Sequence, residues 1–225
     1  MSPVRNRPCA FFDLDGTLTN PQVGIVNCIE YAFERLGLTA PERETLTTWI
    51  GPPLQESFQQ FLGDRNLASQ ALGFYRERFS SRGLLENEII PGMGELLETL
   101  SSRGVECSVV TSKPRVFARR IVEHFGLNPW LTQVIGSELD GTRGDKTELI
   151  RYALEQIGRR AADTIMLGDR HHDITGARNN GVASIGVTWG FGSITELREA
   201  GADAIVNEVP RLMDYWDLAE TAGVN

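Results

Sequence analysis

Two aspartates at the end of a short apolar segment are the first residues that could do chemistry. Asp13 and Asp15 follow the strand-like segment 9–12 and precede Gly16 and Thr17. A regular strand holds residues i and i+2 on one face, so these two carboxylates would lie side by side. Burying such a pair is costly unless a metal, a shared proton or a turn relieves the repulsion. Aspartates also close strand-ending turns for structural reasons alone, so this segment by itself leaves both interpretations open.

Five further polar residues lie at predicted strand ends or helix starts: Thr111, Ser112, Lys146, Asp169 and Asp173. Hydroxyls and aspartates at such places often only cap helices or close turns. Lys146 at a helix start opposes the helix dipole and therefore needs another reason. Because the carboxyl ends of parallel strands meet at one sheet edge, we expect all of these groups to converge there.

The elements that must position these residues follow from apolar periodicity. Predicted strands lie at 9–12, 105–110, 133–135, 164–167, 183–187 and 204–206, and predicted helices at 95–102, 115–125, 146–157, 173–180, 194–200 and 209–220. Strands that alternate with helices predict an α/β fold, a Rossmann-like three-layer core in which helices cover both faces of a parallel sheet.

The segment 20–90 has a different pattern, with four amphipathic helices and no convincing strand. Thr39–Glu42 matches a capping box for the second helix, and the fourth runs to about Arg82. We therefore expect residues 1–19 and 91–225 to form the core, and 20–90 to form a small all-helical cap inserted after the first strand.

Composition bounds the class of protein. The 225 residues are 41% hydrophobic and 23% charged, as in an ordinary globular protein, with a formal net charge of −8. This charge argues against a nucleic acid polymer or an anionic membrane as the partner. Three widely spaced cysteines and the lack of a long apolar run predict a reduced, cytoplasmic protein. Lys113 and Lys146 are the only lysines in the sequence.

Taken in order, four motifs resemble those of the haloacid dehalogenase superfamily of hydrolases. They are Asp13–Thr17, a hydrophobic strand that ends in Thr111, Lys146, and Gly168-Asp169 followed by Asp173. The resemblance covers residues 9 to about 190, and the helical insert resembles the C1 cap of that superfamily. Further segments resemble the phosphoglycolate phosphatase-like branch (51–54 and 112–114) and its bacterial 5′-nucleotidase-like members (136–141, 168–170 and 189–192).

The resemblance implies a phosphatase that works through an aspartyl-phosphate. Asp13 would be the nucleophile, and Asp15 would protonate the leaving oxygen and later deprotonate a water. Mg²⁺ would be the cofactor, bound by Asp13, the main-chain carbonyl of Asp15 and Asp169, with Asp173 just outside this set.

The remaining roles concern the phosphate. Thr111 and the Ser112 amide would hold phosphoryl oxygens, and Lys146 would offset the charge of nucleophile and phosphate. Lys113 could bind the substrate phosphate or form a structural ion pair. His171 and His172 fit a solvated helix start better than a metal site.

The expected substrate is a small phosphate monoester, a 5′-nucleotide or phosphoglycolate. A β-phosphoglucomutase-like phosphotransferase shares the motifs and stays open, as does, less favoured, a non-catalytic phosphate-binding protein. The acid Asp15 favours phosphoryl transfer over dehalogenation, and the lack of lysine in 20–90 argues against a phosphonatase-like enzyme. The sequence leaves open whether the chain is a monomer or a homodimer.

Overall fold

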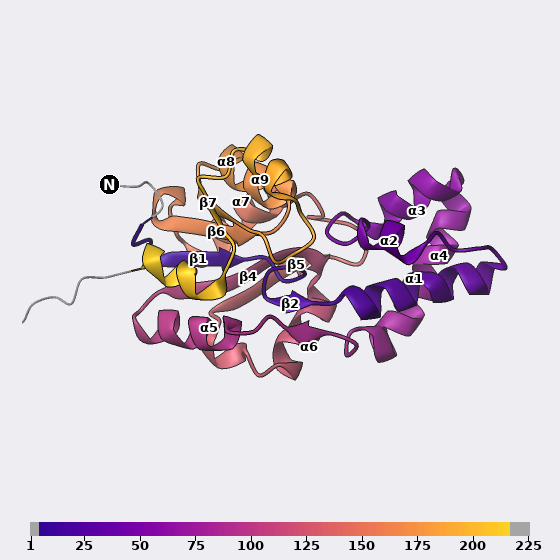
Figure 1. Cartoon of the computed structure of the whole chain (residues 1–225), viewed down its shortest axis with the longest axis horizontal. Coiled ribbons are helices and arrows are strands. Elements are labelled where there is room, and N and C mark those ends of the chain that lie inside the picture. The colour runs from indigo at the N-terminus through magenta and orange to yellow at the C-terminus, as the bar shows by residue number, and fades with distance from the viewer. Residues whose placement is uncertain (1–4, 217–225) are drawn as a thin grey trace, which may run out of the picture.

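A parallel sheet is the centre of the computed structural model, which describes residues 5–216 (Figure 1). Its six strands lie in the order β5-β4-β1-β6-β7-β8, each parallel to its neighbours. They are β1 (Cys9–Phe12), β4 (Glu106–Pro114), β5 (Gln133–Ser137), β6 (Thr164–Gly168), β7 (Ala183–Val187) and β8 (Ala204–Val206). The predicted α/β fold is confirmed.

Strand β1 is buried on both faces. Cys9 and Phe11 pack into one hydrophobic cluster, and Ala10 and Phe12 pack into another on the opposite face. Because neighbouring residues of a strand point to opposite faces, a strand with two covered faces is apolar throughout. This central position places the end of β1, and hence Asp13, in the middle of the sheet edge.

Helices cover both faces of the sheet and make three layers (Figure 1). One face carries α5 (Met93–Ser102) and α6 (Arg115–His124), and the other carries α7 (Lys146–Ile157), α8 (His171–Asn179) and α9 (Ile194–Ala200). Two 3₁₀ turns, η2 (Asn128–Trp130) and η3 (Ala161–Asp163), lie in the connections.

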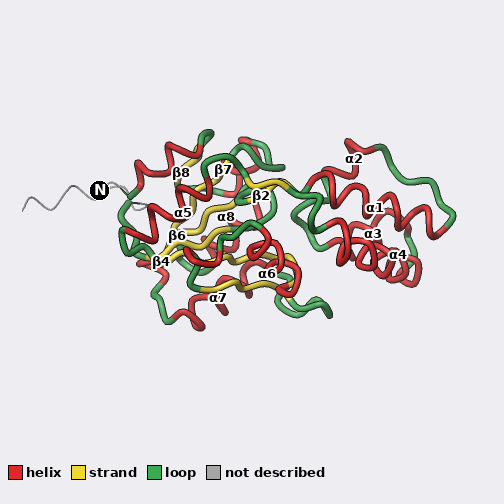
Figure 2. Tube along the Cα trace, turned by 90° about the horizontal axis from the view of Figure 1, so that it is seen from below, coloured by secondary structure: helices red, strands yellow, loops and turns green. Residues whose placement is uncertain are grey.

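The helices after β1 lie at one end of the molecule, beyond the carboxyl ends of the sheet strands (Figures 1 and 2). They are α1 (Gln22–Leu36), α2 (Arg43–Thr47), α3 (Leu54–Leu62), α4 (Arg65–Arg78) and the π-helical turn η1 (Phe79–Gly83). We call them the helical insert. Phe33, Trp49 and Phe58 form its aromatic centre, with ring centroids 5.5–6.4 Å apart. No described helix is both long enough and apolar enough to cross a membrane.

Three local predictions were wrong. A short antiparallel ribbon, β2 (Thr19–Asn20) with β3 (Glu88–Ile89), joins the ends of the supposedly strand-free segment. Each of these strands has only two residues, which is too short for an alternating apolar pattern to be visible in the sequence. The expected capping box is absent, because Glu42 precedes α2 without a side-chain cap.

The third concerns the end of the chain. The expected α-helix at 209–220 is the 3₁₀ helix η4 (Val209–Tyr215), and the prediction beyond Trp216 lies outside the described residues. There Trp216 turns back to donate a hydrogen bond to the Arg7 carbonyl at 2.9 Å. At Trp216 the chain therefore makes this long-range hydrogen bond and does not continue as a regular helix.

Candidate active site

Lys146 joins two of the predicted acids. Its ammonium donates to Asp13 Oδ1 at 2.7 Å and to the Val110 carbonyl at 2.9 Å, and it lies 2.8 Å from Asp173 Oδ1. Burial alone would lower the pKa of Lys146, but the two carboxylates outweigh it and raise that pKa. The helix dipole disfavours a positive charge at the start of α7. The oxygen atoms around the ammonium therefore explain why a charged lysine lies there.

Asp169 follows β6 and is completely buried. Its Oδ2 accepts the Phe191 N–H at 2.7 Å, and its Oδ1 accepts the Thr17 hydroxyl at 3.3 Å. Burial raises the pKa of Asp169 well above its usual value, and the charges of Asp173 and Asp13 raise it further. Gly16 passes close by with φ of 82°, and a Cβ there would lie 2.3 Å from Asp169 Oδ2. Gly16 is thus required both by its conformation and by this approach.

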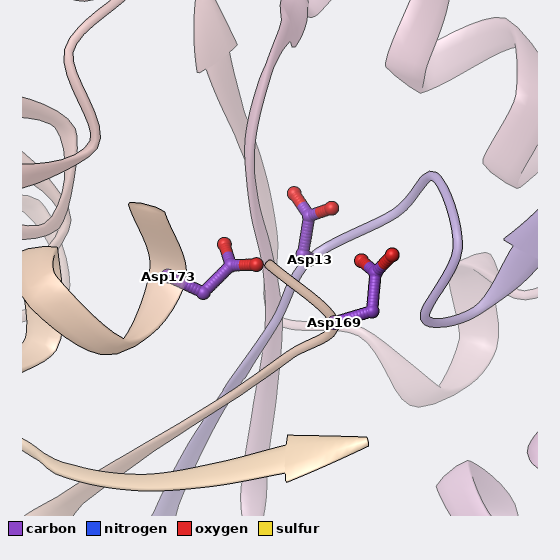
Figure 3. A group of neighbouring side chains, drawn as sticks. All are labelled: Asp13, Asp169 and Asp173. Atoms are coloured by element: carbon purple, nitrogen blue, oxygen red, sulfur yellow. The ribbon is translucent and has the colours of Figure 1, made fainter. Parts of the chain in front are cut away.

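Asp13 after β1, Asp169 after β6 and Asp173 in the first turn of α8 lie close together (Figure 3). One carboxylate oxygen of each lies within 4.8 Å of the others. Three buried acids this close repel one another, and hard oxygen donors of this kind suit Mg²⁺. The donor set therefore fits the expected cofactor. Asp173, expected just outside the metal ligands, lies as near as the other two, but it also pairs with Lys146.

Asp15 has a different partner. Its Oδ2 forms a buried ion pair with Lys113, whereas its Oδ1 is buried without a hydrogen-bond partner among the described residues. Burial raises the pKa of Asp15, and Lys113 opposes that shift. The Lys113 ammonium also lies 4.8 Å from the ring centroid of Phe79 in the helical insert. Each lysine therefore serves one acid of the opening motif, and Lys113 forms the ion pair that was one of its two expected roles.

Thr111 and Ser112 lie beside these acids, although the chain reaches them differently from the prediction. β4 continues to Pro114, with a shift in its pairing to β5 between Thr111 and Pro114. Both residues line a small cavity with Asp13, Asp15 and Lys146. The Ser112 carbonyl accepts the Ser137 hydroxyl at 2.7 Å, which ties this irregular segment to β5.

A larger cavity of about 440 Å³ lies between the sheet edge and the helical insert. Its lining includes Asp15 and Lys113 from the core, and Trp49, Gly51 and Tyr75 from the insert. The segment 51–54 thus borders the site as well as starting a helix. The insert reaches the acids because its helices stand over the strand ends (Figure 1).

Arg170 is a site residue that the sequence reasoning missed. Its Nη1 donates to the Ile50 carbonyl of the insert at 2.6 Å, and its Nε donates to Glu196 Oε1 at 2.9 Å. Glu196 also binds the main-chain N–H and the ring Nδ1 of His171. A charged residue directly after Asp169 was a visible signal, but its partner 120 residues earlier was not.

Trp189 and Phe191 pack against the hydrophobic core. The Trp189 indole donates to the Thr17 carbonyl at 3.1 Å. Both residues therefore brace the loop that carries Gly16 and Thr17. Among the described residues, the acidic group contains no histidine.

Comparisons with known proteins agree with this geometry. The family model of haloacid dehalogenase-like hydrolases matches residues 10–187. A 5′-nucleotidase from Pseudomonas aeruginosa is 50% identical over 192 residues, which cover 85% of this chain and 87% of that protein. The tyrosine-protein kinase PtkA from Mycobacterium tuberculosis is 37% identical over 191 residues, covering 85% of this chain and 65% of that protein.

Comparison with solved structures supports the same family. A protein from Clostridium acetobutylicum, described as a predicted phosphatase, superposes with a TM-score of 0.88 at 40% identity, covering 92% of this chain and 96% of that one. The resemblance drawn from the four motifs is confirmed. This chain belongs to the haloacid dehalogenase-like hydrolase family and is one of its phosphatases.

Proposed function

We propose that this protein is a Mg²⁺-dependent phosphomonoesterase that forms an aspartyl-phosphate on Asp13. The observation that carries the proposal is the unequal pairing of the two acids. Lys146 binds Asp13 Oδ1, and no described residue donates to Oδ2, so one oxygen is held while the other stays available to attack. Asp15 borders the same cavity, where a proton donor is needed.

In the first step, Asp13 attacks phosphorus and the bond from phosphorus to the ester oxygen breaks. Asp15 in its protonated form gives its proton to that leaving oxygen. Burial raises the pKa of Asp15 and so favours the protonated form that this step requires. Lys146 remains charged and offsets the negative charge gathered around phosphorus.

In the second step, ionised Asp15 takes a proton from water, which attacks phosphorus. The bond between phosphorus and Asp13 breaks, which restores the carboxylate and releases inorganic phosphate. Thr111 and the Ser112 amide would bind phosphoryl oxygens throughout. Mg²⁺, held by Asp13, Asp169 and the Asp15 carbonyl, would supply positive charge to those oxygens.

The substrate is a small soluble ester, a 5′-nucleotide or phosphoglycolate. The 5′-nucleotidase relative supports the nucleotide. Residues 20–90 would act as a cap that closes over the site, while 1–19 and 91–225 carry the chemistry. The cavity between insert and sheet edge supports this division.

The test is phosphate release from nucleoside 5′-monophosphates, phosphoglycolate, sugar phosphates and phosphotyrosine. We expect activity to be lost in a chelator and restored by Mg²⁺, and Asp13→Asn to abolish turnover while the protein stays folded. Substantial turnover by that variant would remove the covalent mechanism. Activity without any metal would contradict the assignment of Asp13 and Asp169. An isomerised sugar phosphate without free phosphate would point to a mutase.

A further inference from the structure

Tyr75 carries a polar group at the cavity wall that the proposed reaction does not use. It lies in α4, is 6% exposed and lines the 440 Å³ cavity. Its hydroxyl has no hydrogen-bond partner among the described residues. The hydroxyl is not one of the fully buried atoms that lack a partner, so it is accessible from the cavity and free to bond with a molecule that enters there.

The hydroxyl is also oriented and kept in its donor form. The Tyr75 ring stacks on Phe79 with centroids 5.2 Å apart and planes inclined by 14°. Burial raises the pKa of Tyr75 well above its usual value, so the group remains a neutral O–H donor. A donor held in place before binding loses little freedom when it forms its bond.

The position of Tyr75 in the cavity points to the alcohol side of the ester. Asp15, the proposed donor to the leaving oxygen, lines the same cavity and has an unpartnered Oδ1. The small cavity that holds Asp13, Thr111 and Lys146 does not include Tyr75 in its lining. Tyr75 therefore faces what is attached to the leaving oxygen, while the phosphoryl group has its own partners.

The walls around Tyr75 indicate the chemistry of that leaving group. They are largely apolar and aromatic: Ile25, Trp49, Leu72, Phe79 and Phe117. A cavity of about 440 Å³ is far larger than a two-carbon acid needs, and it is in the range of pockets that enclose ring-bearing ligands. The same lining carries polar side chains such as Gln55, Arg76 and Glu138, so the cavity suits a flat or ring-shaped partner that also offers hydrogen-bonding atoms.

We propose that Tyr75 is a specificity-determining residue whose hydroxyl donates a hydrogen bond to a polar atom on a leaving group that contains a ring. The nucleoside of a nucleoside 5′-monophosphate, with its sugar ring, is a leaving group of this kind. The proposal rests on the phosphatase function proposed above. It predicts that phosphoglycolate, which would leave the apolar walls uncovered, is the poorer substrate.

The experiment compares Tyr75→Phe with the unchanged protein on three esters. A nucleoside 5′-monophosphate offers ring and sugar oxygens, phenyl phosphate offers a ring without them, and phosphoglycolate offers neither ring nor apolar surface. We expect kcat/KM of the variant to fall about five- to tenfold on the nucleotide and by less than about twofold on phenyl phosphate. Tyr31→Phe is the matched control, since it removes a hydroxyl that binds Glu77 on the exposed side of the insert.

The outcomes separate the two proposals. An equal loss on the nucleotide and on phenyl phosphate would make Tyr75 structural and overturn the inference. A preference of the unchanged protein for phosphoglycolate would overturn it as well, with the phosphatase function intact. Unchanged hydrolysis of phenyl phosphate by the variant itself shows that the variant is folded. If no ester is hydrolysed with Mg²⁺ present, the proposed function fails and the inference falls with it.

Discussion

At the scale of single residues, the two aspartates of the opening motif are chemically distinct although they are two positions apart. Asp13 shares Lys146 with Asp173, whereas Asp15 pairs with Lys113 and keeps one oxygen without a described partner. A nucleophile needs an ionised carboxylate, and a proton donor needs a carboxyl group whose pKa is raised. Lys146 thus suits Asp13 to the attack, and burial, which raises the pKa of Asp15 although Lys113 opposes the shift, suits Asp15 to proton donation.

Asp15→Asn should separate the two steps. With 4-nitrophenyl phosphate, whose leaving group needs no proton, Asp13 should still be phosphorylated, but the water would lack its base. We expect steady-state turnover to fall by about 10²- to 10⁴-fold while phosphoenzyme accumulates. Rapid quenching with radiolabelled ester would measure it, with Asp13→Asn as the control that cannot be labelled. Slow turnover without accumulated label would contradict the proton role of Asp15 in the second step.

At the scale of elements, Glu196 of α9 holds the start of α8 beside the acidic group. One carboxylate oxygen accepts from Arg170, the His171 main chain and the His171 ring. Burial alone would raise the pKa of Glu196, but these hydrogen bonds outweigh it and lower the pKa to about 2. The Glu196 carboxylate therefore stabilises the folded protein at every pH at which it is ionised.

The pH dependence of this contribution has a defined sign. The pKa of Glu196 is lower in the folded protein than in the unfolded chain, so ionised Glu196 stabilises the folded state. This stabilisation is fully present above the usual glutamate pKa and is lost as the pH falls toward about 2. Glu196→Gln should therefore lower the thermal unfolding midpoint most near neutral pH, and the difference should shrink as the pH falls from about 5 toward about 2. Glu77→Gln, at an exposed ion pair with Arg35, is the control. A difference independent of pH would refute the ionic account.

At the scale of the whole molecule, the insert and the core meet over the active site through a few directed contacts. Arg170 binds the Ile50 carbonyl at 2.6 Å, and Arg76 binds the Leu139 carbonyl at 2.7 Å. A Cβ at Gly51 would lie 3.1 Å from Arg170 Nη1, so the close approach of this loop suits glycine. Arg170 directly follows Asp169, so this contact links the insert to the acidic group.

Arg170→Gln should weaken the attachment of the insert to the core, because it removes the hydrogen bond to the Ile50 carbonyl. We expect hydrogen exchange in 48–53 to increase, exchange in the central strands to stay the same, and kcat/KM to fall about tenfold, chiefly through KM. Arg160→Gln, which breaks an exposed ion pair with Asp163, is the control. Unchanged exchange in 48–53 would show that the Arg170 contact does not hold the insert.

The sequence by itself determined the family and the α/β alternation, and it pointed to the acids that converge at the sheet edge, because these depend on local patterns. Residues i and i+2 of a strand, apolar spacing along helices and turn residues after strands are all visible within short windows. The strand limits of β1, β7 and β8, and those of α7 and α9, agree with prediction for this reason.

Only the tertiary structure decided which groups are paired. Lys113 lies 98 residues from Asp15, and Lys146 lies 133 residues from Asp13, so no local pattern could assign each lysine to its acid. The β2–β3 ribbon and η4 escaped prediction because elements this short depend on contacts from distant parts of the chain. The cavity that Tyr75 lines has the same origin, because its walls come both from the insert and from the core.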